Sequence, residues 1–183
     1  AGMAMLVTHI SAATGALTWM AIEWIKSGKA TIIGIATGMV AGLATITPAS
    51  GSVGPAGALL IGFLAGLVCF YATQAVKSYF KIDDSLDVFP VHGVGGILGI
   101  IMIAFVGSPD GFLGSGAAGI SEDGAIAQLM IQLQGVIVIS AYTALVTYVI
   151  LRLVNLVTDV RASEEDEDVG LDMSEHNEQG YSL

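Results

Sequence analysis

Long apolar runs separated by short polar segments dominate the chain and predict its helices. Five runs approach or exceed the length that a helix needs to cross a bilayer. The expected helices cover about residues 3–25, 31–47, 53–79, 86–106 and 125–160. We therefore predict an all-α fold, a polytopic membrane helical bundle, with a transmembrane domain over residues 1–160.

The fifth expected helix is longer than a bilayer requires. Residues 125–160 stay largely apolar, and about 36 residues correspond to about 54 Å of α-helix. The hydrocarbon core of a membrane is only about 30 Å thick. We expect this helix to tilt, bend or project from the membrane.

The distribution of charge separates a tail from the apolar part. Charged residues make up 12% of the chain, about half the share of a soluble domain. Half of the sixteen acidic residues lie in residues 161–183, which are otherwise polar. We predict that residues 161–183 form an acidic C-terminal tail.

The basic residues predict the orientation. With five spans, the loops at residues 26–30 and 77–85 and the C-terminus fall on the same side. All six basic residues lie at that side: Lys26, Lys29, Lys77, Lys81, Arg152 and Arg161. Positive residues favour the cytoplasmic side of a membrane. We therefore expect a multi-pass protein of the cell membrane with a cytoplasmic C-terminus.

Small residues recur at helical spacing within the apolar runs. Glycines four residues apart allow transmembrane helices to approach closely. They form three groups: Gly34, Gly38 and Gly42; Gly62 and Gly66; and Gly95 and Gly99. This spacing predicts a tightly packed bundle.

Few residues offer chemistry. Cys69 is the single cysteine and lies in an apolar run, so neither a disulfide nor a cysteine metal site is expected. No nucleophile, metal-ligand set or carboxylate pair appears at membrane depth. We therefore expect neither an enzyme nor a cofactor, and no nucleic-acid partner.

His92 is the candidate functional residue. It follows the start of the fourth expected helix, with apolar residues around it. Ionisable groups at membrane depth are costly and usually face a cavity or a pathway. The alternative is a neutral imidazole that is hydrogen-bonded within the bundle.

Three carboxylates precede that helix: Asp83, Asp84 and Asp87. Acidic side chains cap free N–H groups and favour the positive end of a helix. Pro90 is expected in the first turn, where its missing N–H is harmless. These residues predict the start of the helix that carries His92.

The segment "DDSLDVFPVHGVGGILG" (residues 83–99) resembles the signature of the ammonium transporter family (Amt/Mep/Rh). "EWIKSGKAT", "GIATGMVAGLATITPASGSVGP" and "EEDEDVGLDMSEHNEQGY" are similar to further family segments, in the same order. The resemblance covers almost all of the chain. It implies the C-terminal half of an eleven-helix fold with inverted repeats, from the seventh helix to the eleventh. Many relatives have glycine where Pro90 stands.

The resemblance implies a function and a set of site residues. Family members are homotrimers that transport ammonium or ammonia across the bilayer, through a narrow hydrophobic pore containing two stacked histidines. His92 matches the second histidine, and the first would lie outside this chain. Val88 and Thr47 match positions near the pore wall, and Asp83, Asp84 and Asp87 would lie at the cytoplasmic pore mouth.

The tail also carries a family resemblance. Gly170, Leu171 and Asp172 match its most recognisable triplet, which the resemblance places in a regulatory region near the docking site of PII-type signalling proteins. A glycine there is expected to adopt a backbone conformation closed to other residues.

Two other functions remain open. The same fold can serve as an ammonium sensor, which signals instead of conducting. An unrelated proton-coupled secondary transporter could use His92 as its proton site.

Overall fold

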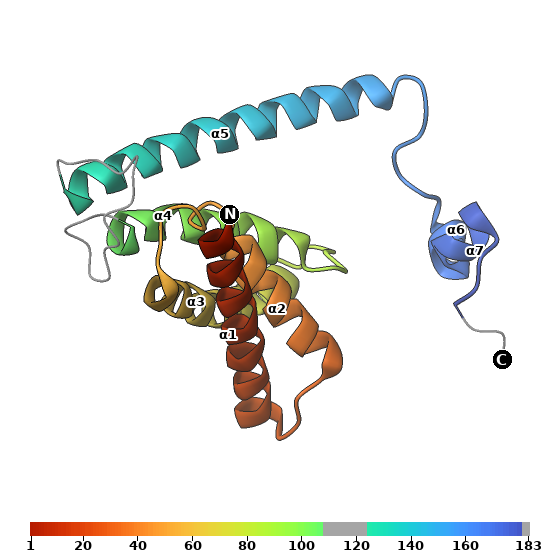
Figure 1. Cartoon of the computed structure of the whole chain (residues 1–183). Helices are drawn as coiled ribbons and strands as arrows, with labels where there is room; N and C mark the ends of the chain where they lie inside the picture. Colours follow the sequence, from red (N-terminus) through yellow and green to blue (C-terminus); the bar gives the residue numbers. More distant parts are fainter. Residues whose placement is uncertain (108–123, 181–183) are drawn as a thin grey trace. The chain divides into compact units, whose positions relative to one another are not determined.

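The described part of the chain is helical. The computed structural model describes residues 1–107 and 124–180, and every regular element in these residues is a helix. The chain divides into two compact units, Ala1–Val136 and Ile137–Leu183, which we describe one at a time. Figure 1 labels the helices along the chain. The predicted all-α class is confirmed.

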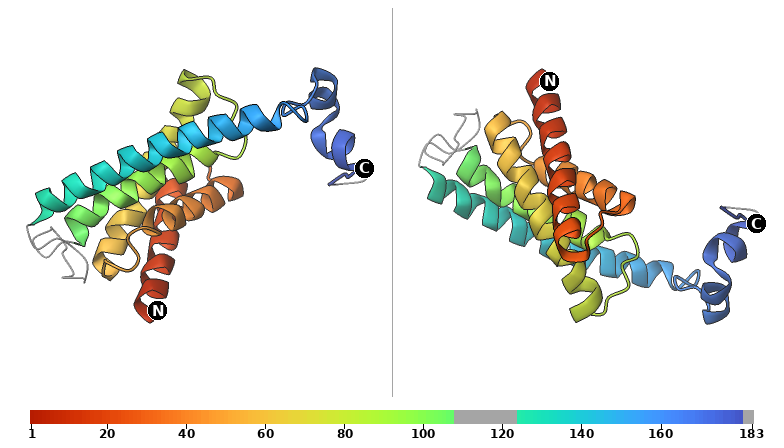
Figure 2. Two further views of the ribbon diagram at one scale, coloured as in Figure 1. Left: turned by 90° about the horizontal axis from the view of Figure 1, so that it is seen from above. Right: turned by 90° about the horizontal axis from the view of Figure 1, so that it is seen from below.

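Residues 1–107 of the first unit form six consecutive helical segments. Four are α-helices and two are π-helices, which have wider turns. They are α1 (Gly2–Ser27), α2 (Ile32–Ile46), α3 (Pro55–Gln74), η1 (Ala75–Tyr79), η2 (Phe89–Val94) and α4 (Gly95–Val106). Helix α1 packs against α2 and α3, and α2 also contacts α4 and η2; two further views of this bundle are given in Figure 2. Helix α3 continues directly into η1, and η2 into α4.

Four helices among the described residues are long and apolar enough to cross a membrane. They are Gly2–Ser27, Pro55–Tyr79, Phe89–Val106 and Ala125–Val154. The helix α2 has only 15 residues, which is about 22 Å of helix and shorter than the expected range of 31–47. It ends at Ile46, and a turn follows in which the N–H of Ala49 donates to the Ile46 carbonyl.

The connection between α1 and α2 is fixed by local backbone chemistry. Gly28 ends α1 with φ of 74°, and its N–H donates to the Trp24 carbonyl at 2.9 Å. This left-handed conformation favours glycine. Thr31 then caps α2, with its hydroxyl accepting from the Gly34 N–H. A loop of only a few residues therefore reverses the chain.

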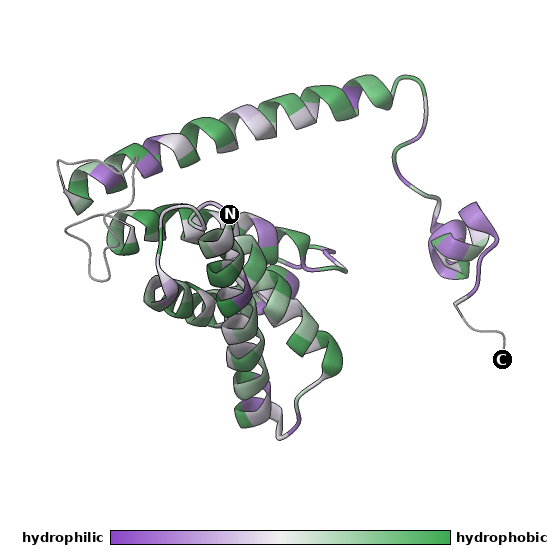
Figure 3. Ribbon diagram, viewed as in Figure 1, coloured by the Kyte–Doolittle hydropathy of each residue, from purple (hydrophilic) through white to green (hydrophobic). Residues whose placement is uncertain are grey.

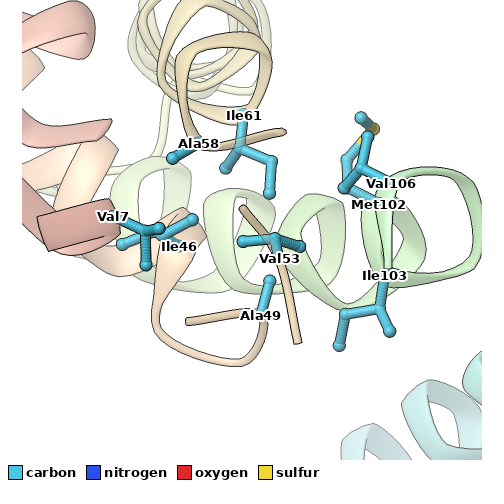
Figure 4. Packing of buried hydrophobic residues seen from close by; sticks show 9 residues of the cluster. All are labelled: Val7, Ile46, Ala49, Val53, Ala58, Ile61, Met102, Ile103 and Val106. Atoms are coloured by element: carbon cyan, nitrogen blue, oxygen red, sulfur yellow. The ribbon is translucent and has the colours of Figure 1, made fainter. Parts of the chain in front are cut away.

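Two clusters of buried apolar residues hold the bundle together. The larger cluster draws from α1, α2, α3, α4 and the connection after α2, and Figure 4 shows its side chains. It contains Val7, Ile46, Ala49, Val53, Ala58, Ile61, Met102, Ile103 and Val106. The smaller cluster contains Trp19, Ala41, Cys69, Phe70 and Val91. One of its members, Val91, immediately precedes His92.

Glycines set the distance between the helices, as their spacing predicts. A Cβ atom at Gly42 of α2 would collide with the carbonyl oxygen of Ser11 in α1. One at Gly99 of α4 would collide with the carbonyl oxygen of Thr45 in α2. The hydroxyl of Ser11 also donates to the Gly42 carbonyl at 2.9 Å. Backbones therefore touch where these helices cross.

The fifth helix, α5 (Ala125–Val154), ends before the predicted limit at residue 160. After Val154 the backbone bonds tighten, with the N–H of Val157 donating to the Val154 carbonyl at 2.9 Å. The Asn155 side chain accepts from the Val160 N–H. Asn side chains compete with helical hydrogen bonds, and this competition favours the end of the helix here. The helix therefore ends before the apolar sequence does. Thirty residues still give about 45 Å of helix.

The second unit ends in two short helices, α6 (Glu164–Val169) and α7 (Leu171–His176), which contact each other. Ser163 caps α6 by accepting from the Asp166 N–H at 3.1 Å. Figure 3 shows the change from the largely apolar α5 to these more polar helices. Residues 181–183 of the predicted tail lie outside the described residues.

Candidate functional site

His92 lies in η2, the π-helical segment before α4. Pro90 occupies the first turn of this segment, as predicted. Pro90 and Val91 are buried, whereas the side chain of His92 is exposed in this chain. π-Helical turns often occur at functional sites. The wide turn therefore anchors its proline and valine in the bundle and leaves the imidazole on the surface of the chain.

The imidazole lines a cavity of about 310 Å³ beside α2. Five residues of α2 form one wall: Ile32, Ile33, Ala36, Thr37 and Val40. Leu86 and Val91 complete the lining with His92. Thr37 is the only other residue of this lining with a polar side chain, and its hydroxyl donates to the Ile33 carbonyl at 2.9 Å. The cavity is therefore apolar, with an imidazole and one hydroxyl.

Thr47 and Val88 do not line this cavity. Thr47 follows α2, and its hydroxyl donates to the Leu43 carbonyl at 2.7 Å. It lies seven residues after Val40, which is two helical turns and places both on one face of α2. Val88 precedes η2 and is exposed. Thr47 thus extends the face that borders the cavity, and Val88 lies one turn before His92.

Asp84 caps the segment that carries His92. Its two carboxylate oxygens accept from the N–H groups of Val88 and Phe89, each at 2.8 Å. These amides begin the helix and have no earlier carbonyl partner. Asp83 is exposed, and its carboxylate accepts from the Ser85 hydroxyl at 3.2 Å. Of the three predicted aspartates, Asp84 therefore performs the capping.

Asp87 has a different environment. Its Oδ1 lies 2.7 Å from Nζ of Lys77 in η1, and its backbone φ is 56°. It lines a second cavity of about 240 Å³, which also contains Glu23, Thr31 and Thr73. The loops 28–31 and 80–88 thus lie at the same end of the bundle, which we call the lysine end. Thr37 borders both this cavity and that of His92.

Three residues of this region were not predicted as site residues. Glu23 accepts from Trp19, at 3.2 Å, and from Thr31. Thr37 faces the imidazole cavity, and Lys77 pairs with Asp87. Thr37 could have been found from the sequence, because it lies about one helical turn before Val40, which shares a face of α2 with the predicted Thr47. The sequence analysis used Lys77 only to predict the membrane orientation. Nothing in the sequence indicates that this lysine has a carboxylate partner.

The predicted tail triplet lies at the junction of α6 and α7. Gly170 has φ of 94° and ψ of 128°, a conformation that other residues rarely adopt. The expected backbone conformation is confirmed. Leu171 and Asp172 begin α7, and both are exposed. The glycine therefore allows two short helices to follow each other without a linker.

The described residues offer no group of three metal-binding side chains of the types His, Cys, Asp and Glu. His92 has no second histidine among the residues that line its cavity. Within the described chain, this site therefore consists of an imidazole, a hydroxyl and apolar walls.

The sequence is similar to curated ammonium transporters. It is 41% identical over 183 residues to the "Ammonium transporter" of Aquifex aeolicus, covering 100% of this chain and 42% of that protein. It is 41% identical over 180 residues to "Ammonium transporter Amt1" of Archaeoglobus fulgidus, covering 98% of this chain and 44% of that protein. The chain thus spans about two-fifths of the length of these relatives.

Solved structures show the same fold. The crystal structure of Saccharomyces cerevisiae Mep2 matches with a TM-score of 0.76 and 34% identity, over 90% of this chain and 38% of that chain. A structure described as "Sensor Amt Protein" matches with a TM-score of 0.81 and 27% identity, over 96% and 42%. The predicted membrane helical bundle is confirmed. The model of the Ammonium Transporter Family matches residues 1–181, and the chain belongs to this family.

Proposed function

We propose that this chain forms part of a membrane transporter that moves ammonium or ammonia through a hydrophobic pore. Family membership supports the substrate. The cavity that joins His92 to the apolar face of α2 carries the proposal. His92 would be one of two pore histidines, and its partner would belong to a part of the protein outside this chain.

The chemistry of the cavity favours the neutral species. An ammonium ion loses much hydration energy in an apolar passage, whereas ammonia loses far less. A neutral imidazole accepts a hydrogen bond at one ring nitrogen and donates at the other. His92 would therefore stabilise ammonia without requiring a charged partner. A second imidazole would let the pair pass a proton along the same route.

Thr47 and Val88 belong to the proposed pore wall. Thr47 continues the face of α2 that borders the His92 cavity, and Val88 lies one turn before His92. Asp83, Asp84 and Asp87 would lie at the cytoplasmic mouth, since they occupy the lysine end. The positive residues at this end support a cytoplasmic location, together with the C-terminus.

We further propose that the complete protein is a homotrimer in the cell membrane. The resemblance to the family supports this assembly. The tail with Gly170, Leu171 and Asp172 would then be a regulatory segment, near which a PII-type signalling protein docks. Leu171 is exposed on α7, so an apolar side chain is available for such a contact.

The test is transport by the full-length protein with His92→Ala. We expect the rate of methylammonium uptake in vesicles to fall, and the ratio of current to uptake on a supported membrane to change. His176→Ala in the exposed tail serves as a matched control. Unchanged rate and unchanged current with His92→Ala would remove His92 from the transport route.

An ammonium sensor is the second candidate. The likeness to the structure described as "Sensor Amt Protein" favours it. A sensor would bind methylammonium without net flux, whereas a transporter would accumulate it. Measuring binding and uptake on the same vesicles distinguishes the two. An unrelated secondary transporter is no longer a candidate, because the chain belongs to the ammonium transporter family.

A further inference from the structure

An ion pair joins η1, which continues α3, to the start of the His92 segment. Nζ of Lys77 lies 2.7 Å from Oδ1 of Asp87. The Asp87 side chain is only 16% exposed, and that of Lys77 is 42% exposed. Screening by solvent is therefore weaker than for an ion pair between two fully exposed side chains. The pair spans the loop between two π-helical segments.

Asp87 is the joint between this loop and the helix. Its N–H donates to the Asp84 carbonyl at 3.2 Å, and its own carbonyl accepts from the Val91 N–H at 3.0 Å. Its φ of 56° bends the chain at this point. Val91 immediately precedes His92, so a rotation at Asp87 would displace the imidazole.

Lys77 is held by the bundle. It lies in η1, where the N–H of Phe80 donates to the Ala75 carbonyl at 2.9 Å. Val76, its neighbour, is 5% exposed and fixes this segment against the bundle. Lys77 therefore offers a positive charge from a supported position.

The start of η2 needs such a support. Leu86, Val88 and Phe89 are all exposed, by 83%, 52% and 59%. Farther along, the close contact of Gly99 with Thr45 fixes α4. At the start of the segment, we identify three constraints: the Asp84 cap on the N–H groups of Val88 and Phe89, the burial of Pro90 and Val91, and the Lys77–Asp87 pair.

The second cavity gives the pair an electrostatic role as well. Glu23 of α1 and Asp87 line this cavity together. Without Lys77, the two carboxylates would share a small space, and Asp87 would lose the counter-charge that lies 2.7 Å away. Removal of one member of a partly buried pair costs more than removal of both. Asp87 is the more buried of the two side chains, so the charge left unpaired by loss of Lys77 is less well solvated than the charge left by loss of Asp87. Loss of Lys77 is therefore expected to be worse than loss of Asp87.

We propose that Lys77 and Asp87 form a positioning pair that holds the π-helical segment and thereby fixes His92 beside α2. Neither residue needs to touch the transported molecule. The expected effect on transport rests on the proposed function of His92, whereas the effect on the position of His92 does not.

The experiment uses the full-length protein with Lys77→Met, Asp87→Asn and the double substitution. Asn tolerates a positive φ, so Asp87→Asn removes the charge and keeps the bend. Two quantities are measured: methylammonium uptake, and the rate at which diethyl pyrocarbonate modifies His92, followed by mass spectrometry. Lys29→Met is the matched control, because Lys29 is an exposed lysine in the loop 28–31 at the same end.

We expect Lys77→Met to lower the maximal uptake rate about tenfold, since small displacements of a positioned group have large effects on rate. Asp87→Asn and the double variant should each lower it about threefold, because groups that act as a pair are not additive. The KM should change less than twofold. The modification rate of His92 should change at least about threefold in Lys77→Met and remain near wild type in Lys29→Met.

A charge restored after folding covers the case in which Lys77→Met does not fold. Lys77→Cys is treated with aminoethyl methanethiosulfonate, which adds a positive amine, or with methyl methanethiosulfonate, which adds none. If Lys77 and Asp87 form a positioning pair, uptake and the modification rate of His92 should recover with the first reagent only. Equal results with both reagents would overturn the proposal.

The remaining outcomes separate the two hypotheses. A changed modification rate of His92 with unchanged uptake would support the positioning pair and contradict the transport role of His92. An unchanged modification rate in Lys77→Met, or losses of uptake that multiply in the double variant to about thirtyfold, would overturn the positioning pair.

Discussion

The carboxylate of Glu23, near the end of α1, accepts a hydrogen bond of 2.8 Å from the backbone N–H of Thr31, at the start of α2. The Thr31 hydroxyl donates to the same carboxylate at 3.1 Å and accepts from the Gly34 N–H at 2.9 Å. A Cβ atom at Gly34 would collide with the Glu23 carboxylate. One acidic side chain thus joins two helices and supports the cap of the second.

Glu23→Ala is expected to destabilise the protein by about 0.5–1.5 kcal/mol, because it removes the hydrogen bond between its carboxylate and the exposed Thr31 N–H. The measurement is thermal unfolding of the purified protein in detergent. Thr31→Ser is the control, since it keeps both the hydroxyl donor and the acceptor. An unchanged unfolding temperature for Glu23→Ala would show that the contact contributes nothing measurable.

Gly99→Ala should disrupt the crossing of α4 and α2. The added methyl group would meet the carbonyl oxygen of Thr45 and Pro48, and overpacking of this kind costs about 1–3 kcal/mol. Gly96→Ala, one turn earlier in the same helix, is the matched control because a Cβ atom there meets nothing within 4 Å. Unfolding in detergent should separate the two variants, and equal stability would contradict the close contact.

Asp84→Ala should weaken the start of the His92 segment. The N–H groups of Val88 and Phe89 would lose their acceptors, and loss of a helix cap costs about 0.5–2 kcal/mol. Hydrogen exchange at these two amides should become faster. Asp83→Ala, its exposed neighbour, should leave the exchange unchanged. Similar exchange rates in both variants would exclude a specific capping role for Asp84.

Thr37→Val tests the one hydroxyl in the His92 cavity. Valine has nearly the same shape, and the Thr37 hydroxyl donates to the Ile33 carbonyl of its own helix, so the fold should persist. If the hydroxyl also meets the transported species, methylammonium uptake should fall by about two- to tenfold, the effect of one hydrogen bond. Thr37→Ser should restore most of it. Full activity of the valine variant would leave His92 as the only polar contact of the cavity.

Gly170→Ala tests the junction of the tail helices. Its φ of 94° would cost a side-chain-bearing residue about 1–3 kcal/mol, so α7 should lose protection against hydrogen exchange. Gly180→Ala is the control, since Gly180 lies in the same tail without a positive φ. If uptake also changes in Gly170→Ala alone, the tail acts on transport. Equal protection of α7 in both variants would contradict the strained junction.

The sequence predicted the helices better than their ends. The apolar runs located the helices because long apolar segments must satisfy their own backbone hydrogen bonds in a membrane. The end of α5 differed, since hydropathy does not register the turn at Asn155. The π-helical turns around Val76 and His92 were also missed, because they depend on an extra residue per turn, which no apolar pattern reveals.

For the site, sequence reasoning found residues but not their partners. Asp83, Asp84 and Asp87 look alike in the sequence, yet Asp84 caps a helix, Asp87 binds Lys77, and Asp83 is exposed. Lys77 and Asp87 are ten positions apart, and the sequence alone does not give the path of the loop between them. Only the fold determines which carboxylate meets the lysine.

By itself, the sequence determined an all-α membrane protein of the ammonium transporter family, with His92 at the start of a helix. These properties follow from apolar length and from residues that are adjacent in the chain. The tertiary structure decided what each of these residues meets: the α2 wall beside His92, the Glu23 cap on Thr31, and the Lys77–Asp87 pair. The reason is physical. Contacts between helices depend on the rotation and separation of each helix, and the close backbone approach at Gly42 and Gly99 fixes these only once the chain has folded.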